Sequence, residues 1–166
     1  MTHPFFSTSF RRDPQQPRDL HARIDAQLVE RIEEAVDFVC LDALVRTRRA
    51  RGGTEPAADN ETDRQEFRVS VEAFLARLER ELLRELPQAQ QQRIEQRAAG
   101  SGADAPVMRQ VGLARELPHY WQRFDEIREA YTAQYVAAGG IPPAPDDQDS
   151  SRGEPRGALR RLLGRR

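Results

Sequence analysis

The sequence predicts an all-α fold: a bundle of about three long helices plus one subsidiary helix, with a disordered N-terminal arm and a C-terminal linker. Three observations lead to this prediction. Apolar residues recur at three- and four-residue steps, which is the spacing of one helical face. Charged residues make up 32% of the chain and hydrophobic residues 38%, a balance that favours helices with narrow apolar stripes. Glycine and proline cluster at the breaks between these segments.

Residues 1–18 are expected to form a flexible arm, because prolines and polar residues leave no apolar period there. Phe5, Phe6 and Phe10 depart from that composition. They could dock on a partner, but docking on the protein's own core is the preferred interpretation.

The first long helix is predicted over 19–48, with Asp19 as its N-cap and one face formed by Leu20, Ile24, Leu28, Ile32, Val36 and Val39. The far side of this helix also carries Val29, Cys40, Leu41, Leu44 and Val45, so its second half is apolar nearly all round. More than one neighbour must therefore cover this half, and part of it is expected to bury against another chain, most simply a second copy.

A basic cluster follows this helix and consists of Arg46, Arg48, Arg49 and Arg51. Cations suit the negative end of a helix dipole, so the cluster is interpreted as a solvated cap in preference to a phosphate site.

The second long helix is predicted over 62–86, where apolar residues follow one face and charged residues the other. Pro87 blocks its continuation, so the subsidiary helix at 88–99 should leave at an angle. Ile94 is the one large apolar residue of that segment, which predicts a surface helix or a frayed extension.

The third long helix is predicted over 106–138 and contains the chain's single Trp and all three Tyr. Pro118 lies inside it, so either the helix kinks there or a short helix ends near Glu116 and another begins at Pro118. The aromatic stripe could line a cofactor pocket, but its helical spacing favours core packing. Residues 19–138 thus form the helical domain, followed by a disordered linker at 139–156 and a basic amphipathic tip at 157–166.

The sequence carries no phosphate-binding glycine loop, nucleophile elbow or dinucleotide motif, so neither catalytic residues nor a cofactor are expected. Cys40 is the single cysteine and sits in an apolar run, which predicts a buried, inert thiol. Glu116 and His119 form an E-x-x-H pattern similar to that of ferritin-like di-iron bundles, although Pro118 interrupts it. A small metal-binding bundle is therefore the alternative to a non-enzymatic protein.

Charge is distributed unevenly along the chain. Residues 1–18 carry a net charge of +2 and residues 152–166 a net charge of +5, which leaves −8 on the remainder of a chain whose total is −1. An acidic body repels nucleic-acid backbones, so nucleic acid is not an expected partner. No signal peptide or membrane-spanning run is present, which predicts a cytoplasmic protein. All 26 basic residues are Arg, as in proteins from GC-rich bacterial genomes.

The C-terminal tip carries the clearest functional pattern. Its docking residues are predicted to be Leu159, Arg160, Arg161, Leu162, Leu163, Arg165 and Arg166, three leucines on one helical face with arginines around them. Such a segment could bind an anionic membrane surface at the inner face of the membrane, or a groove on a partner protein. The tip resembles the C-terminal membrane-targeting peptides of some bacterial cell-division regulators, and also the cargo-loading peptides of bacterial protein compartments. The sequence therefore predicts a non-enzymatic helical adaptor or regulatory protein.

Overall fold

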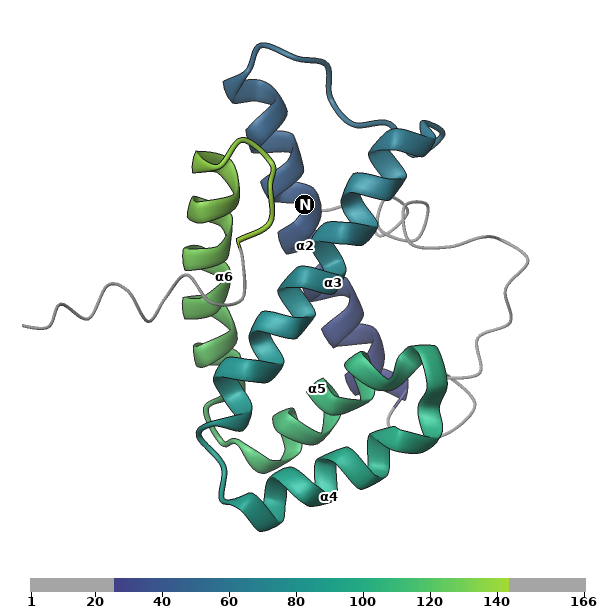
Figure 1. Cartoon of the computed structure of the whole chain (residues 1–166), viewed down its shortest axis with the longest axis vertical. Coiled ribbons are helices and arrows are strands. Elements are labelled where there is room, and N and C mark those ends of the chain that lie inside the picture. Colours follow the sequence, from purple (N-terminus) through teal and green to yellow (C-terminus); the bar gives the residue numbers. More distant parts are fainter. Residues whose placement is uncertain (1–25, 144–166) are drawn as a thin grey trace, which may run out of the picture.

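The computed structural model describes residues 26–143 and confirms the all-α bundle (Figure 1). This range contains five α-helices, one 3-10 segment and no strand. The elements are α2 (Ala26–Ala50), α3 (Glu61–Leu83), α4 (Gln88–Ala98), η2 (Ala99–Asp104), α5 (Ala105–Glu116) and α6 (Tyr120–Ala137). The arm at 1–18, the predicted helix start at Asp19, most of the linker and the tip lie outside the described residues.

The prediction of one long helix over 106–138 is wrong, and the alternative of two helices is correct. α5 ends at Glu116 and α6 begins at Tyr120. The reason is Pro118, which disfavours a helical conformation of the residue before it. Leu117 accordingly has extended backbone angles, with φ −102° and ψ 111°.

Three helices, α2, α3 and α6, form the main bundle (Figure 1). α2 and α3 are antiparallel, since Arg48 near the end of α2 contacts Asp63 at the start of α3. α2 and α6 run parallel: the Arg31 guanidinium lies 4.2 Å from the Trp121 ring near their starts, and Arg51 contacts Gly139 near their ends. A parallel pair needs a long crossover, and the segment from α3 to α5 supplies it.

α5 crosses one end of this bundle and packs on both α2 and α3, while α4 packs on the outer side of α5 (Figure 1). Ile94 of α4 is buried, so this helix is not only a surface extension. Its Cγ1 atom would lie 3.0 Å from a β-carbon at position 112. Gly112 is therefore the residue that lets α4 and α5 approach so closely.

The core lies where α2, α3, α5 and α6 meet, and its centre is aromatic. The Phe74 ring lies 5.5 Å from the Phe124 ring and 5.0 Å from the Tyr131 ring, between ring centres. Tyr120, Phe124 and Tyr131 of the aromatic stripe are buried, as the prediction of core packing requires, whereas Trp121 is half-buried at the edge of the core. Cys40 is also buried, as predicted.

Glycines end the two parallel helices. At the end of α6, Gly139 and Gly140 have φ values of 71° and 93°, and their N–H groups donate to the carbonyls of Val136 and Tyr135. Left-handed backbone of this kind favours glycine and closes a helix. A β-carbon at Gly139 would also overlap the Arg51 guanidinium, so this glycine allows the cation to contact the end of α6.

Candidate functional site

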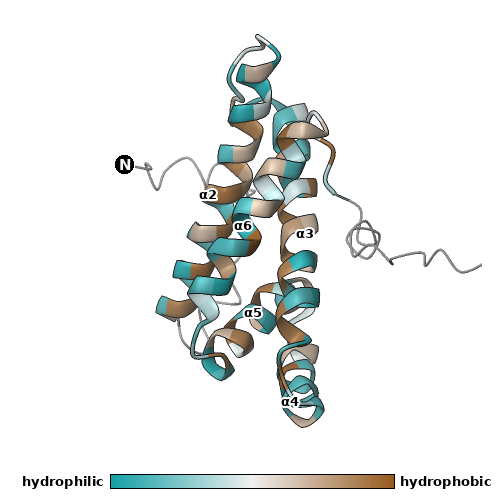
Figure 2. Cartoon of the chain, turned by 90° about the vertical axis from the view of Figure 1, so that its left-hand side faces the viewer, coloured by the Kyte–Doolittle hydropathy of each residue, from teal (hydrophilic) through white to brown (hydrophobic). Residues whose placement is uncertain are grey.

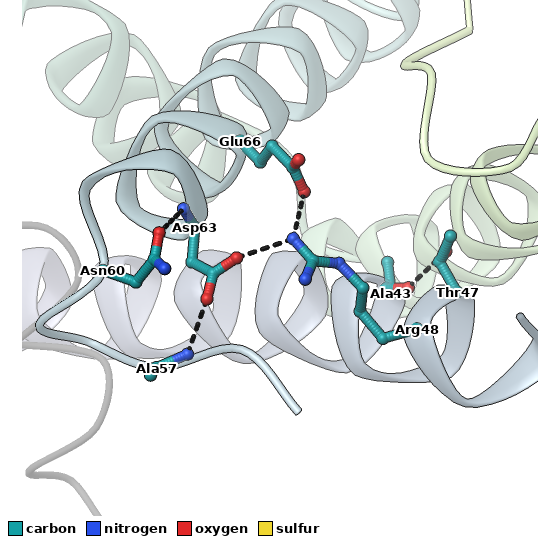
Figure 3. A network of polar contacts seen from close by, with 7 residues as sticks. All are labelled: Ala43, Thr47, Arg48, Ala57, Asn60, Asp63 and Glu66. Carbon is teal, nitrogen blue, oxygen red and sulfur yellow. Dashed lines mark hydrogen bonds and ion pairs between the residues drawn. The ribbon is translucent and has the colours of Figure 1, made fainter. Parts of the chain in front are cut away.

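The basic cluster lies at the C-terminal end of α2, and its residue Arg48 joins α2 to α3 (Figure 3). Arg48 Nη2 donates to Asp63 Oδ1 at 2.6 Å and to Glu66 Oε2 at 2.8 Å. Hydrogen bonding to Glu66 is the main reason that the pKa of Arg48 is raised. The second Asp63 oxygen accepts from the Ala57 N–H at 2.9 Å, and the Asp63 N–H donates to Asn60 Oδ1, so Asn60 caps α3.

The other cations of the cluster also have partners within the chain. Arg46 pairs with Asp42 at 2.9 Å between Nε and Oδ2. Arg49 pairs with Glu55 at 2.6 Å. With Arg51 lying against Gly139, all four cations have contacts within the chain, so the cluster does not present four free charges to a phosphate. Arg48 joins α2 to α3 at a largely buried site, which differs from the solvated cap predicted from the sequence, whereas Arg46 and Arg49 are exposed.

Two pairs of polar side chains are buried between helices. Tyr131 Oη lies 2.9 Å from Ser70 Oγ and also donates to the Ser70 carbonyl. Tyr120 donates to Gln110 Oε1 at 3.0 Å, whereas Gln110 Nε2 has no hydrogen-bond partner in the structure. Burial raises the pKa of Tyr120 and Tyr131, and the hydrogen bonds of these two phenols join α6 to α5 and to α3.

Glu116 and His119, the residues of the metal-binding alternative, contact different partners. Glu116 lies at the end of α5, where its carboxylate is 3.6 Å from the guanidinium of Arg93. His119 lies in the turn before α6, and its Nε2 is 2.9 Å from Glu85 Oε2. Because Pro118 separates the two helices, the E-x-x-H residues are not on one helical face.

Glu85 binds two residues of α6 and its preceding turn. Partial burial raises the pKa of Glu85, but hydrogen bonds from His119 and Arg123 outweigh it, and the pKa lies below its usual value. Across residues 26–143, no group of three or more His, Cys, Asp or Glu side chains could hold a metal ion. Within the same range, no helix is long and apolar enough to cross a membrane.

An apolar stripe is exposed on α2 and is the clearest candidate interaction surface. It consists of Phe38, Leu41 and Val45, which follow one another at three- and four-residue steps and share one face of the helix. Phe38 is 40% exposed, and Leu41 and Val45 are half-buried. α2 lies along one side of the bundle (Figure 2), and the exposure of Phe38 places this α2 stripe on the outer face of the helix.

The sequence-based choice of outward residues was partly wrong. Leu44 is 1% exposed and belongs to the core, while Phe38 takes its place on the outer face. The error has a simple cause: a helix that is apolar nearly all round does not show which side its neighbours cover. The spacing of Phe38 with Leu41 and Val45 was the signal available in the sequence.

The predicted docking residues of the tip, from Leu159 to Arg166, lie outside the described residues, as do Phe5, Phe6 and Phe10. Comparison with protein-family models, curated proteins and solved structures finds no match to this chain. The functional argument therefore depends on the chain's own residues.

Proposed function

We propose that this chain is a non-enzymatic helical adaptor or regulatory protein, which makes a protein contact through the α2 stripe and docks through its C-terminal tip. The α2 stripe is the observation that carries the proposal. Phe38 is exposed, and Leu41 and Val45 are half-buried beside it on one helical face, with Leu41 also packed against the core. Contact of these apolar side chains with water has no stabilising effect. Neighbouring apolar side chains that stay in contact with water on one face can mark a protein interface.

The use of the chain's charged residues supports a binding role. Several pairs join different helices, including Arg109 with Glu79 and Glu95, and Arg123 with Glu85. These side chains stabilise the bundle and are not gathered around a common point. A rigid body that presents one apolar surface suits an adaptor.

The tip adds the second contact. Arginines near an anionic lipid surface contribute about 1 kcal/mol each, and the three leucines of 157–166 add a small apolar insertion. The resulting binding is weak and reversible, which suits a protein that is recruited to a surface. The alternative binding site for the tip is a groove on a partner protein, where the leucines dominate the contact.

Vesicle flotation of the full chain tests the docking role of the tip. Vesicles of phosphatidylcholine alone are compared with vesicles of equal parts phosphatidylcholine and phosphatidylglycerol. Binding that needs the anionic lipid, falls with salt and disappears on deletion of 157–166 supports membrane docking. If the tip binds a protein instead, Leu162→Glu abolishes recovery of that protein and salt has less effect. Unchanged localisation and partner recovery in cells after deletion of 157–166 would refute the role of the tip.

A further inference from the structure

We propose that the α2 stripe binds the same stripe of a second copy of this chain, with the two α2 helices antiparallel around a two-fold axis near Leu41 and Asp42. This inference rests on the proposed function, because it names the occupant of the contact surface described there. It is carried by the order of charged and apolar residues along the outer face of α2.

The stripe has an acidic end and a basic end. Glu34 lies four residues before Phe38, and Arg49 lies four residues after Val45. Both charged residues are exposed and lie on the same outer face as the stripe, since three- and four-residue steps connect them. From Glu34 onwards the face therefore reads acid, aromatic, aliphatic, aliphatic, base. Arg31, which is exposed three residues before Glu34, lies over the Trp121 ring of its own chain.

Two copies of this face are complementary in charge only when their α2 helices run antiparallel. Around a point midway between positions 41 and 42, Glu34 corresponds to Arg49, and Phe38 corresponds to Val45. An antiparallel pair places each Glu34 against the partner copy's basic end and each Phe38 against the partner copy's aliphatic end. A parallel pair in register places like charges together, which is unfavourable. A two-fold axis of this kind is the commonest symmetry of homodimers.

The side chains near the axis are compatible with close approach. Asp42, which lies beside Leu41, forms an ion pair with Arg46 in its own chain, so its charge is already compensated. Arg49 is free to exchange partners, because its pair with Glu55 joins side chains that are 68% and 67% exposed. Exposed pairs of this kind contribute little to stability.

Dimerisation would also strengthen the tip. Two copies carry two tips, and binding of the first raises the effective concentration of the second to about the millimolar range for a short flexible connection. A weak single tip then becomes a useful recruitment device.

Sedimentation equilibrium of the full chain, from about 1 to 100 μM, tests the dimer, since weak interfaces associate in this range. The wild-type mass should rise towards that of two chains. Phe38→Glu should hold the protein at one chain. Val69→Glu is the matched control, because Val69 is 41% exposed on α3 and lies off the stripe; it should associate like the wild type. Circular dichroism checks that both variants remain helical.

A charge exchange tests the antiparallel arrangement. Glu34→Arg and Arg49→Glu should each weaken association about three- to tenfold, because each change replaces two opposite-charge contacts with like-charge contacts. Combining them should restore association to within about twofold. The two positions are 15 residues apart on one helix, about 22 Å, so rescue cannot arise within one chain.

Three results would overturn the dimer. The first is a wild-type protein that stays monomeric across the range. The second is a Phe38→Glu variant that associates like Val69→Glu. The third is a double variant weaker than either single one. If the wild type stays monomeric but the chain without residues 1–18 dimerises, the arm with Phe5, Phe6 and Phe10 occupies the stripe instead.

The experiments distinguish a refuted dimer from a refuted docking role of the tip. Flotation on phosphatidylcholine–phosphatidylglycerol vesicles reports the tip directly, and a monomeric Phe38→Glu chain with an intact tip should still float, with lower apparent affinity. Flotation of a monomeric wild type would remove the dimer and leave membrane docking of the adaptor in place.

Discussion

Replacing Asp63 with alanine should destabilise the bundle, because Asp63 belongs to a largely buried ion pair between α2 and α3. Asp63 is 5% exposed, and its two carboxylate oxygens accept from the Arg48 guanidinium and the Ala57 N–H. Hydrogen bonds that involve a charged group contribute about 1.5–3 kcal/mol each. Arg48 keeps its bond to Glu66 after the substitution, so the loss is less than the sum of two such bonds.

We therefore expect Asp63→Ala to lower the free energy of unfolding by about 2–4 kcal/mol. Urea unfolding followed by circular dichroism at 222 nm measures this change. Asp63→Asn should lose less, because the amide oxygen can still accept one of the two bonds.

Glu55→Ala is the matched control, since it removes the carboxylate partner of Arg49 at a mostly exposed site. It should change the free energy of unfolding by less than about 1 kcal/mol. Equal losses for Asp63→Ala and Glu55→Ala would refute the reasoning, because burial of the Asp63 carboxylate would then have no measurable effect.

Three further predictions follow from the contacts of single residues. Tyr131→Phe leaves the buried Ser70 hydroxyl without its tyrosine partner, so thermal unfolding should show a loss of about 1–2 kcal/mol, and no loss would show that this hydrogen bond is dispensable. The pKa of Glu85 is below its usual 4.5 in the folded chain, so its stabilising effect is present above that pH and is lost as the pH falls through the lower folded pKa. Between about pH 6 and about pH 3, the free energy of unfolding from urea titrations should therefore fall less for Glu85→Gln than for the wild type. An equal fall would contradict the cause given for the lowered pKa of Glu85. The free energy of unfolding of Phe38→Glu should differ from that of the wild type by less than about 0.5 kcal/mol at a concentration where the protein is monomeric. Leu44→Glu places a charge in the core and should prevent folding. Similar behaviour of the two variants would mean that α2 has no outer apolar face.

The sequence alone determined the class of fold and most of the helix ends in the described range, because these depend on local chemistry. Pro118 interrupts the helical pattern of 106–138 because the residue before a proline avoids helical backbone, and glycines at 52, 139 and 140 supply the left-handed backbone that closes α2 and α6. The spacing of apolar residues on α3 is also a local property, and both ends of α3 lie within three residues of the predicted bounds, 62–86.

Only the tertiary structure decided which side of α2 faces outward and what each charged residue contacts. Leu44 and Phe38 are both large and apolar and lie in the same segment, and the difference between a core side chain and an exposed one depends on where α3, α5 and α6 pack. The pairing of Arg48 with Asp63 and Glu66 joins residues 15 and 18 positions apart. The contact between His119 and Glu85 spans 34 positions. Contacts over such separations form only when the helices dock, and periodicity within one helix carries no information about them.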